Sequence, residues 1–274
     1  MAVLNKETMA ATEAFNELAG VYDAIFTDSV IGLAQRKSVW KEIDRIFTPG
    51  QHVLEINCGT GVDALHLAKR GVHVTACDSA QRMVTVARQR AQLASVLATV
   101  DFRVLANERV GTLWNEGPFD GVLSNFAGLN CNSDLSSLAY DLAHLVKERS
   151  KMLLCLFGRL CLWETFWFLS RGDVPKAVRR FRCGGRSAVL SARAETTVWY
   201  HPLRHLRKVF SPYFRLVDWK GVGVLVLPSY LEFVAKKYPN LFCFASEIDP
   251  WLGGCPGLRA TADHMLLTFE RTLR

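Results

Sequence analysis

The residues most suited to binding a ligand form the stretch VLEINCGTGVDALHLA, residues 53–68. It reads as a strand, a glycine-containing turn and the start of a helix, the arrangement in which nucleotide-binding folds hold a charged ligand. Gly59-x-Gly61-x-x-Ala64 also satisfies the dinucleotide fingerprint. Glu55 precedes the turn, and its carboxylate would repel a pyrophosphate, whereas it suits a ligand that carries an ammonium and a sulfonium.

Asp78 ends the next expected strand, 19 residues after Gly59. A carboxylate in that place can accept hydrogen bonds from both hydroxyls of a ribose, which dinucleotides and S-adenosyl ligands share. Alternatively, Asp78 caps the helix that follows it. The chain has no G-x-x-x-x-G-K-[ST] sequence, so the usual nucleoside triphosphate loop is not indicated. These residues therefore favour an adenosine-type ligand without choosing between the two classes.

The elements that must position these residues alternate between strand and helix. Amphipathic helices are expected at 9–19 and 31–47, followed by apolar strands at 51–57, 72–78, 99–106, 119–126 and 151–157, with closing strands at 214–226 and 264–272. Apolar strands separated by helices indicate a mostly parallel sheet covered on both faces. The helix after the fourth strand is expected to begin at a Ser133 cap.

The bulk composition is that of a globular protein, with 50% hydrophobic and 22% charged residues in 274. The chain has no apolar leader and no uninterrupted apolar stretch long enough for a membrane span. Its eight cysteines include no C-x-x-C pair, which favours buried reduced thiols over disulfides or zinc. We therefore expect a cytoplasmic protein with no metal site and no transmembrane segment.

Positive charge is concentrated between Arg171 and Lys208. This segment holds ten Lys and Arg residues and two acidic residues, Asp173 and Glu195, so its charge is +8. The rest of the chain has a charge of −1, which gives the net charge of +7. Such a segment either attracts anionic partners or forms an ordinary solvated surface. The sequence leaves both interpretations open.

Three motifs together resemble one known family. EINCGTG (55–61), DSAQRM (78–83) and FDGVLSNF (119–126) are similar to successive motifs of the class I S-adenosylmethionine-dependent methyltransferases, and the resemblance extends over roughly 13–157. It implies an α/β, Rossmann-like fold with helices on both faces of a seven-stranded, mostly parallel sheet, in the order 3-2-1-4-5-7-6 with the last strand antiparallel. The implied cofactor is S-adenosyl-L-methionine and the implied product S-adenosyl-L-homocysteine.

The absence of repeats or linkers predicts a single domain over 1–274. The resemblance divides it into N-terminal lid helices at about 9–47, the sheet, and a substrate-cover insertion at about 158–212 after the fifth strand. The insertion is expected to contain an aromatic helix, a basic helix, a Gly184-Gly185 turn, an alternating strand and a further helix.

The resemblance also implies roles for individual residues. Glu55, Asn57 and Gly59 would line the methionine part of the cofactor, Asp78 would hold the ribose, and Met83 and Asn107 would face the adenine. Ser124, Asn125 and Phe126 would border the sulfonium, and Tyr22 would cover the cofactor. The complete expected cofactor-binding set is Tyr22, Glu55, Asn57, Gly59, Gly61, Asp78, Ser79, Met83, Asn107, Ser124, Asn125 and Phe126.

Two features depart from the family pattern. The glycine pair usual before the fifth strand is replaced by KERSK (147–151). The first glycine of E-x-G-x-G-x-G is replaced by Asn57. Asparagine is among the few residues other than glycine that tolerate a positive φ, so we expect the turn to survive.

The methyl acceptor is less well defined by the sequence. SNFAGLN (124–130) is not the [DNS]-P-P-[YF] motif of amino-directed nucleic-acid methyltransferases. Asn130, Trp163 and Glu164 are candidates for an acceptor pocket, although helical spacing favours core packing for most of the aromatic run 163–168. His201 is a candidate general base, with Tyr200 beside it; a histidine that caps a helix or lies on the surface is the alternative.

The function most consistent with these features is methyl transfer to oxygen, nitrogen or carbon of a small apolar or anionic metabolite. The alternatives are an RNA methyltransferase that uses the basic segment 171–208, and a non-catalytic binding module with a methyltransferase fold. Cofactor chemistry other than methyl transfer also remains open. Nucleic acid is not the expected partner, and the sequence does not define the acceptor or the oligomeric state.

Overall fold

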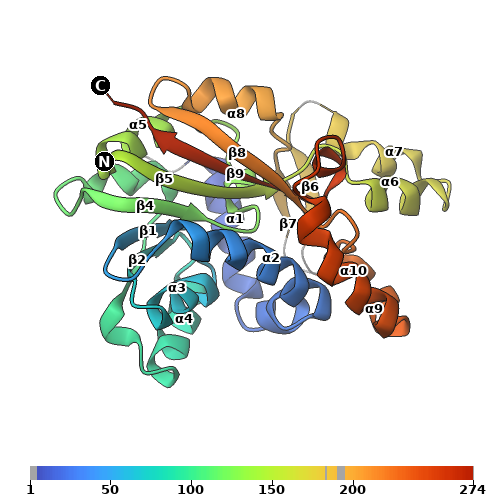
Figure 1. Ribbon diagram of the computed structural model, residues 1–274, viewed down its shortest axis with the longest axis horizontal. Coiled ribbons are helices and arrows are strands. Elements are labelled where there is room, and N and C mark those ends of the chain that lie inside the picture. Colours follow the sequence, from blue (N-terminus) through green and yellow to red (C-terminus); the bar gives the residue numbers. More distant parts are fainter. Residues whose placement is uncertain (1–4, 183, 190–194, 274) are drawn as a thin grey trace.

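The computed structural model describes residues 5–182, 184–189 and 195–273 (Figure 1). The expected alternating strand after Gly185 falls partly on residues 190–194, which lie outside the described residues, as does Cys183. Within the described residues no helix is both long and apolar enough to span a bilayer.

Seven strands form one sheet, and its order is the predicted one. β9 lies antiparallel between β5 and β8, and all other neighbours are parallel. Because β8 and β9 are the sixth and seventh strands of this sheet in chain order, the expected order 3-2-1-4-5-7-6 with an antiparallel last strand is confirmed. In sheet order the strands are β3 (Val100–Val104), β2 (His73–Asp78), β1 (His52–Ile56), β4 (Phe119–Ser124), β5 (Val146–Phe157), β9 (His264–Arg271) and β8 (Phe214–Val222).

Helices cover both faces of the sheet (Figure 1). The two expected N-terminal helices form α1 and α2, and the stretch between β8 and β9 contains α9 and α10. The helices are α1 (Lys6–Leu18), α2 (Val30–Ile46), α3 (Val62–Lys69), α4 (Gln81–Leu93), α5 (Ser136–Leu145), α6 (Leu162–Leu169), α7 (Val174–Ala177), α8 (Leu203–Phe210), α9 (Glu232–Lys237) and α10 (Pro239–Leu252). Shorter turns include a π-helical turn, Asp23–Thr27, and 3₁₀ turns at Asn107–Leu113 and Gly128–Cys131.

The central strands are largely apolar because they bury side chains on both faces, whereas the edge strands β3 and β8 also carry exposed charged residues such as Asp101 and Arg215. Val53 packs in the cluster formed by α2, α3 and α4, whereas its neighbour Leu54 packs in the cluster formed by α5 and α8. Successive side chains of a strand point to opposite faces, so the central strands of a sheet covered on both sides need hydrophobic residues at most positions. The expected three-layer arrangement follows from this pattern.

The connection from α5 to β5 differs from the expectation. α5 begins at Ser136, not at Ser133, and it is Asp134 that accepts hydrogen bonds from the Ser136 amide and hydroxyl. β5 begins at Val146, before the strand start expected at residue 151, and its pairing with β4 shifts register near its start. Arg149 has a φ of 60° in this irregular segment, where the resemblance led us to expect a glycine pair.

The insertion between β5 and β8 contains α6, α7, a small hairpin and α8. The hairpin pairs β6 (Arg186–Val189) with β7 (Glu195–Val198). The expected basic helix is split, because α7 ends at Ala177 and a separate 3₁₀ turn, Arg179–Phe181, follows it. β7 packs against α1, so the insertion and the N-terminal helix meet above the carboxyl ends of the strands.

Candidate functional site

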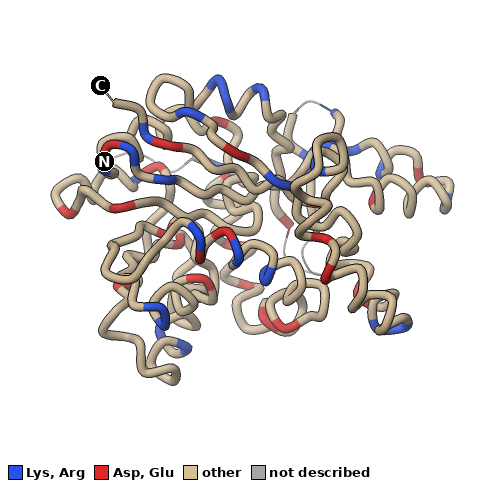
Figure 2. The backbone as a smooth tube through the Cα atoms, in the orientation of Figure 1, with Lys and Arg blue, Asp and Glu red and all other residues tan. Residues whose placement is uncertain are grey.

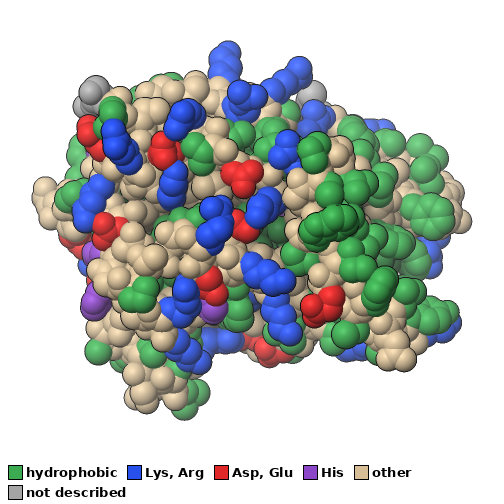
Figure 3. Space-filling model, in the orientation of Figure 1, with side chains coloured by type: hydrophobic (Ala, Val, Ile, Leu, Met, Phe, Trp, Pro, Cys, Tyr) green, Lys and Arg blue, Asp and Glu red, His purple; other side chains and the backbone are tan. Residues whose placement is uncertain are grey.

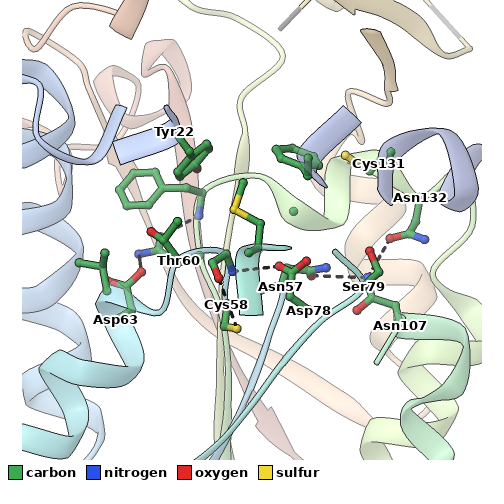
Figure 4. A pocket seen from close by; sticks show the side chains of 18 of the residues that line it. Tyr22, Asn57, Cys58, Thr60, Asp63, Asp78, Ser79, Asn107, Cys131 and Asn132 are labelled. Atoms are coloured by element: carbon green, nitrogen blue, oxygen red, sulfur yellow. Dashed lines mark hydrogen bonds between the residues drawn. The ribbon is translucent and has the colours of Figure 1, made fainter. Parts of the chain in front are cut away.

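A cavity that is partly open to solvent lies at the carboxyl ends of β1, β2 and β4 under α1 (Figure 4). The strand order reverses between β1 and β4, which is where open α/β sheets bind ligands. The residues that line it are Thr8, Ala11, Phe15, Tyr22, Arg36, Asn57, Cys58, Gly59, Thr60, Val62, Asp63, Asp78, Ser79, Met83, Asn107, Asn125, Phe126, Gly128, Cys131 and Asn132.

The turn after β1 forms the floor of this cavity. Asn57, Gly59 and Gly61 have φ values of 58°, 53° and 75°, so all three take the left-handed conformation. The expectation that Asn57 accepts a positive φ is confirmed. Gly61 is required for a different reason, because a Cβ there would lie 2.7 Å from the Ala87 side chain of α4.

The Asn57 side chain does more than tolerate the turn. Its Oδ1 accepts hydrogen bonds from Ser124 Oγ at 3.2 Å and from Asn107 Nδ2 at 3.4 Å. Gly128 packs directly against it, and a Cβ on Gly128 would overlap the Asn57 side chain. Asn57 therefore links β1, β4 and the 3₁₀ turn at 107–113 through its amide.

This packing predicts that Asn57 and Gly128 are energetically coupled. We expect Gly128→Ala to cost about 1–3 kcal/mol in the wild-type background, because overpacking forces side chains from their positions. In an Asn57→Gly background the same substitution should cost much less, and Asn57→Gly alone should leave cofactor binding within a few-fold. Urea unfolding of the four proteins of this cycle measures the coupling; an equal cost of Gly128→Ala in both backgrounds would contradict it.

Asp78 presents a half-buried carboxylate to the cavity. Its Oδ2 accepts a hydrogen bond from the Gly59 amide and its Oδ1 one from the Ala80 amide, both at 2.9 Å. Burial raises the pKa of Asp78 despite these bonds. Each carboxylate oxygen has a second lone-pair site, so Asp78 can hold the glycine turn and still accept hydrogen bonds from a pair of ligand hydroxyls.

Glu55 lies in β1 and is 1% exposed. Its Oε2 has no hydrogen-bond partner, and burial, reinforced by the charge of Asp63, raises the pKa of Glu55 well above its usual value. A buried carboxyl without a partner is costly in its charged form, and a nearby cation would stabilise that form. Glu55 does not itself line the cavity.

Arg36 is a cavity residue that the sequence analysis missed. Its guanidinium pairs with Asp63 at 2.5 Å, lies 4.7 Å from the centre of the Phe126 ring, and keeps a buried Nε without a hydrogen-bond partner. Arg36 shares the buried face of α2 with Val39 and Ile43, at positions i, i+3 and i+7. An arginine at a position of the helix where the periodicity predicts a buried hydrophobic residue was the signal that could have identified Arg36.

Asp63 anchors this ion pair from the first turn of α3. Burial would raise the pKa of Asp63, but the charge and hydrogen bond of Arg36 outweigh it and lower the pKa. Trp40 Nε1 and Asn125 Nδ2 also donate to the carboxylate, at 2.7 and 2.9 Å. Both oxygens of the Asp63 carboxylate therefore accept hydrogen bonds, while Arg36 lies in the wall of the cavity.

α1 and the π-helical turn close the cavity like a lid. Thr12 donates to Ser79 Oγ at 2.8 Å, Thr8 donates to Glu108, and Thr60 donates to Asp23 at 2.7 Å. Burial raises the pKa of Tyr22 to about 12, so its hydroxyl is neutral. These few polar contacts join the lid to the rim of the cavity.

Nine of the twelve expected cofactor residues line this one cavity. They are Tyr22, Asn57, Gly59, Asp78, Ser79, Met83, Asn107, Asn125 and Phe126. Glu55, Gly61 and Ser124 do not reach its wall, although Ser124 contacts it through Asn57. Sequence motifs from three separate strands are thus brought together around one space.

The two residues expected to be catalytic lie outside the wall of the cavity. His201 is 5% exposed, and its Nε2 lies 2.9 Å from the carbonyl oxygen of Asn132. Burial lowers the pKa of His201, so its ring is neutral and donates to that carbonyl. Tyr200 packs beside the Phe157 ring, with the Arg180 guanidinium 5.4 Å from its own ring. Their catalytic roles stay predictions.

The three expected acceptor-binding residues also make internal contacts. Asn130 donates to the Trp199 carbonyl at 2.7 Å and accepts from the Phe157 amide at 3.0 Å. Trp163 donates to the Val224 carbonyl at 3.1 Å. Glu164 is 1% exposed and is bound by the guanidinium groups of both Arg179 and Arg180. None of the three lines the described cavity.

The basic segment 171–208 does not form one continuous patch in its described part (Figure 2). Arg180 is 4% exposed and is paired with Glu164 and Asp263. The exposed Arg207 and Lys208 lie on α8, a helix on one face of the sheet, away from α7. Part of the charge is therefore consumed inside the protein, and the rest is divided between separate elements.

The described part of the chain contains neither a disulfide nor a cluster of side chains suited to a metal ion. The cysteines described there are all free, and Cys58, Cys77, Cys155 and Cys161 are buried. Within those residues no three His, Cys, Asp or Glu side chains gather closely enough to hold a metal ion.

Comparison with known proteins agrees with this geometry. Residues 53–149 match the family described as "Methyltransferase domain". The chain is 26% identical to a demethylmenaquinone methyltransferase of Tropheryma whipplei over 58% of this chain and 63% of that protein, and 26% identical to one of Thermobifida fusca over 82% and 96%. It thus spans just under two thirds of the length of the first of these relatives.

The fold is shared with a solved structure of a putative S-adenosylmethionine-dependent methyltransferase from Listeria monocytogenes. The TM-score is 0.59 at 14% identity, over 86% of this chain and 99% of that one. The sheet order, the glycine turn after β1 and the match over residues 53–149 together make this chain similar to the class I S-adenosylmethionine-dependent methyltransferases.

Proposed function

We propose that this protein transfers the methyl group of S-adenosyl-L-methionine to oxygen, nitrogen or carbon of a small apolar or anionic metabolite. The observation that carries the proposal is the presence, in the wall of one cavity, of both the half-buried Asp78 carboxylate and a buried Arg36 whose Nε is unpartnered. The cofactor presents a ribose diol and a carboxylate, which match these two groups.

The cavity also suits the other parts of the cofactor. Met83 and Phe126 supply apolar surface for the adenine and the thioether side, and Asn107 and Asn132 supply amide groups. Glu55, buried with an unpartnered Oε2, favours a ligand that carries positive charge. When bound, the cofactor supplies a methyl group on a sulfonium that is reactive toward a nucleophile.

The residues around the cavity would promote methyl transfer mainly by aligning the acceptor with the cofactor. An in-line displacement gains most when the two reacting atoms are held in contact and water is excluded. The hydrogen bond from His201 to the Asn132 carbonyl holds the loop that carries Cys131 and Asn132 at the cavity wall. His201 remains our candidate for removing a proton from the acceptor, with Tyr200 beside it.

An apolar acceptor is favoured by two features. The relatives are named demethylmenaquinone methyltransferases, and their named substrate is a largely apolar quinone. Phe15, Phe126 and Met83 give this cavity an apolar surface as well. We therefore place quinol-like phenols and related apolar nucleophiles first among the acceptors to be tested.

Calorimetry with S-adenosylmethionine and S-adenosylhomocysteine tests the cofactor assignment directly. We expect saturable binding of both by the full chain. A methyl-transfer assay with radiolabelled cofactor and a demethylated naphthoquinol then tests the acceptor class, and labelled product should be extractable into organic solvent. Absence of cofactor binding would refute the proposal as a whole, whereas binding without transfer to any apolar phenol would refute the acceptor class.

A further inference from the structure

Two helices that do not line the cavity carry stripes of exposed hydrophobic side chains. On α6 these are Leu162, Phe166 and Leu169, at positions i, i+4 and i+7, and Phe166 is 68% exposed. On α10 they are Leu241, Phe244 and Trp251, which are 67%, 63% and 73% exposed. Figure 3 shows hydrophobic side chains gathered over the end of the molecule that carries α6, α7, α9 and α10.

The exposure does not arise from loosely attached helices. The inner sides of α6 and α9 pack into a buried cluster with Ile31 and Ala34 of α2. The Glu232 carboxylate accepts hydrogen bonds from the Val30 and Ile31 amides at the start of α2, at 2.9 and 3.1 Å. The fully buried Asp249 of α10 accepts three more from the backbone that follows β8. The helices are thus firmly held, with apolar stripes on their outer faces.

Basic side chains border these stripes. Lys236 and Lys237 end α9, where Lys236 is exposed near Glu232 and Lys237 lies over the Tyr238 ring. Arg171 follows α6 and stacks 3.3 Å from the centre of the Trp167 ring. The helices therefore combine Trp, Phe and Leu with a cationic border. Among the acidic residues there, Glu232 is engaged with the start of α2 and with Lys236, whereas Glu247 is exposed on α10 between Phe244 and Trp251.

We propose that this face, formed by α6, α9 and α10, docks on an anionic lipid bilayer. Neighbouring exposed hydrophobic side chains on well-packed helices mark an interaction surface. Aromatic and aliphatic residues on one side of a helix, with Lys and Arg at its edge, are the pattern of helices that lie in the plane of the membrane interface. The cationic border matches negatively charged headgroups, which attract basic side chains near the surface.

A bilayer is favoured over a second copy of this chain because the border is cationic. Two such faces brought together would place Lys236, Lys237 and Arg171 near their own counterparts, and like charges at an interface oppose association. Lipid headgroups supply the opposite charge. The proposal concerns this surface alone and does not depend on which reaction the cavity performs.

Vesicle flotation with the full chain tests the proposal. Wild type should float with vesicles of phosphatidylcholine mixed with phosphatidylglycerol, and much less with phosphatidylcholine alone. High salt should weaken the binding, since the charge contribution is screened. The double variant Phe244→Glu, Trp251→Glu should lose at least about tenfold in partitioning, because inserted apolar side chains contribute most of the affinity. Phe166→Glu on α6 should show a loss in the same direction.

Leu93→Glu is the matched control, because Leu93 is 88% exposed on α4, outside this face. It should float like wild type. All variants replace exposed side chains, and unchanged thermal unfolding and unchanged calorimetric binding of S-adenosylhomocysteine would show that each is folded. If S-adenosylhomocysteine does not bind even to wild type, thermal unfolding and circular dichroism show whether each variant is folded.

Two results would overturn the proposal. One is flotation without the expected dependence, in which wild type is recovered equally with and without anionic vesicles or the Phe244→Glu, Trp251→Glu variant floats like wild type. The other is a concentration-dependent dimer in sedimentation equilibrium that the same variant dissociates, in the absence of vesicle binding. That outcome would assign the face to a second copy of the chain.

Discussion

Asp78→Ala is expected to lower the affinity for S-adenosylmethionine about 100-fold. The Asp78 carboxylate lies in the cavity wall with lone pairs available beyond its bonds to the Gly59 and Ala80 amides. Two hydrogen bonds from ribose hydroxyls to a charged acceptor contribute together about 3 kcal/mol, which is about two factors of ten in affinity. Calorimetric titration of wild type and variant measures the loss.

Asp101→Ala is a suitable control for this experiment. Asp101 lies on the neighbouring strand β3, is exposed and pairs with Arg103, so its removal should leave the affinity unchanged. Asp78→Asn should fall between wild type and Asp78→Ala, since one side-chain oxygen acceptor remains. A dissociation constant for Asp78→Ala within threefold of wild type would exclude a ribose-binding role for this carboxylate.

Arg36→Met is expected to cost about 3–5 kcal/mol of the free energy of unfolding at neutral pH. The substitution leaves Asp63 as a buried carboxylate that has lost its counter-charge, and breaking a buried pair from one side has this order of cost. Arg36 and Asp63 are each about 6% exposed at the side chain. Denaturant unfolding measures the change. Arg103→Met, which breaks a more exposed pair, should cost no more than about 1 kcal/mol.

The pH dependence of this loss has a defined sign. Arg36 lowers the pKa of Asp63 in the folded state, so the pair stabilises the wild type above the unfolded-state value of 3.8 and loses that contribution as the pH falls through the lower folded-state pKa. The difference between wild type and Arg36→Met should therefore shrink in acid. Adding Asp63→Asn to Arg36→Met should recover part of the stability at neutral pH, and no recovery would show that the ion pair is not the source of the loss.

The sheet and the cofactor turn were predictable because local patterns determine them. Apolar strands alternating with helices define a covered parallel sheet, and the resemblance supplied the strand order. The positive φ of Asn57 followed from the residue type and its place in the turn. Asp78 was predictable because the carboxyl ends of parallel strands meet at one edge of the sheet.

The cover was harder to predict because the direction of a side chain depends on distant partners. Glu164 follows β5 closely in sequence, yet Arg179 and Arg180 turn its carboxylate into the interior. The same contacts explain why the net charge of 171–208 gave a poor description of its surface. Arg36 and Asp63 are 27 residues apart, and neither motif nor periodicity states which buried acid meets which buried base. The Ser133 cap failed because Asp134, one residue later, supplies the better acceptor.

The position of β9 has a consequence for how the chain must fold. Among the described strands, β8 reaches the sheet solely through β9, and β9 separates β8 from β5. During synthesis, β1 to β5 emerge from the ribosome well before β9, so β5 waits as an unpaired sheet edge with a strongly apolar sequence. Such an edge can pair with other chains. Folding yield in the cell should therefore depend on the interval between synthesis of Phe157 and of Arg271, a cost that arises from strand order and not from the stability of the finished protein.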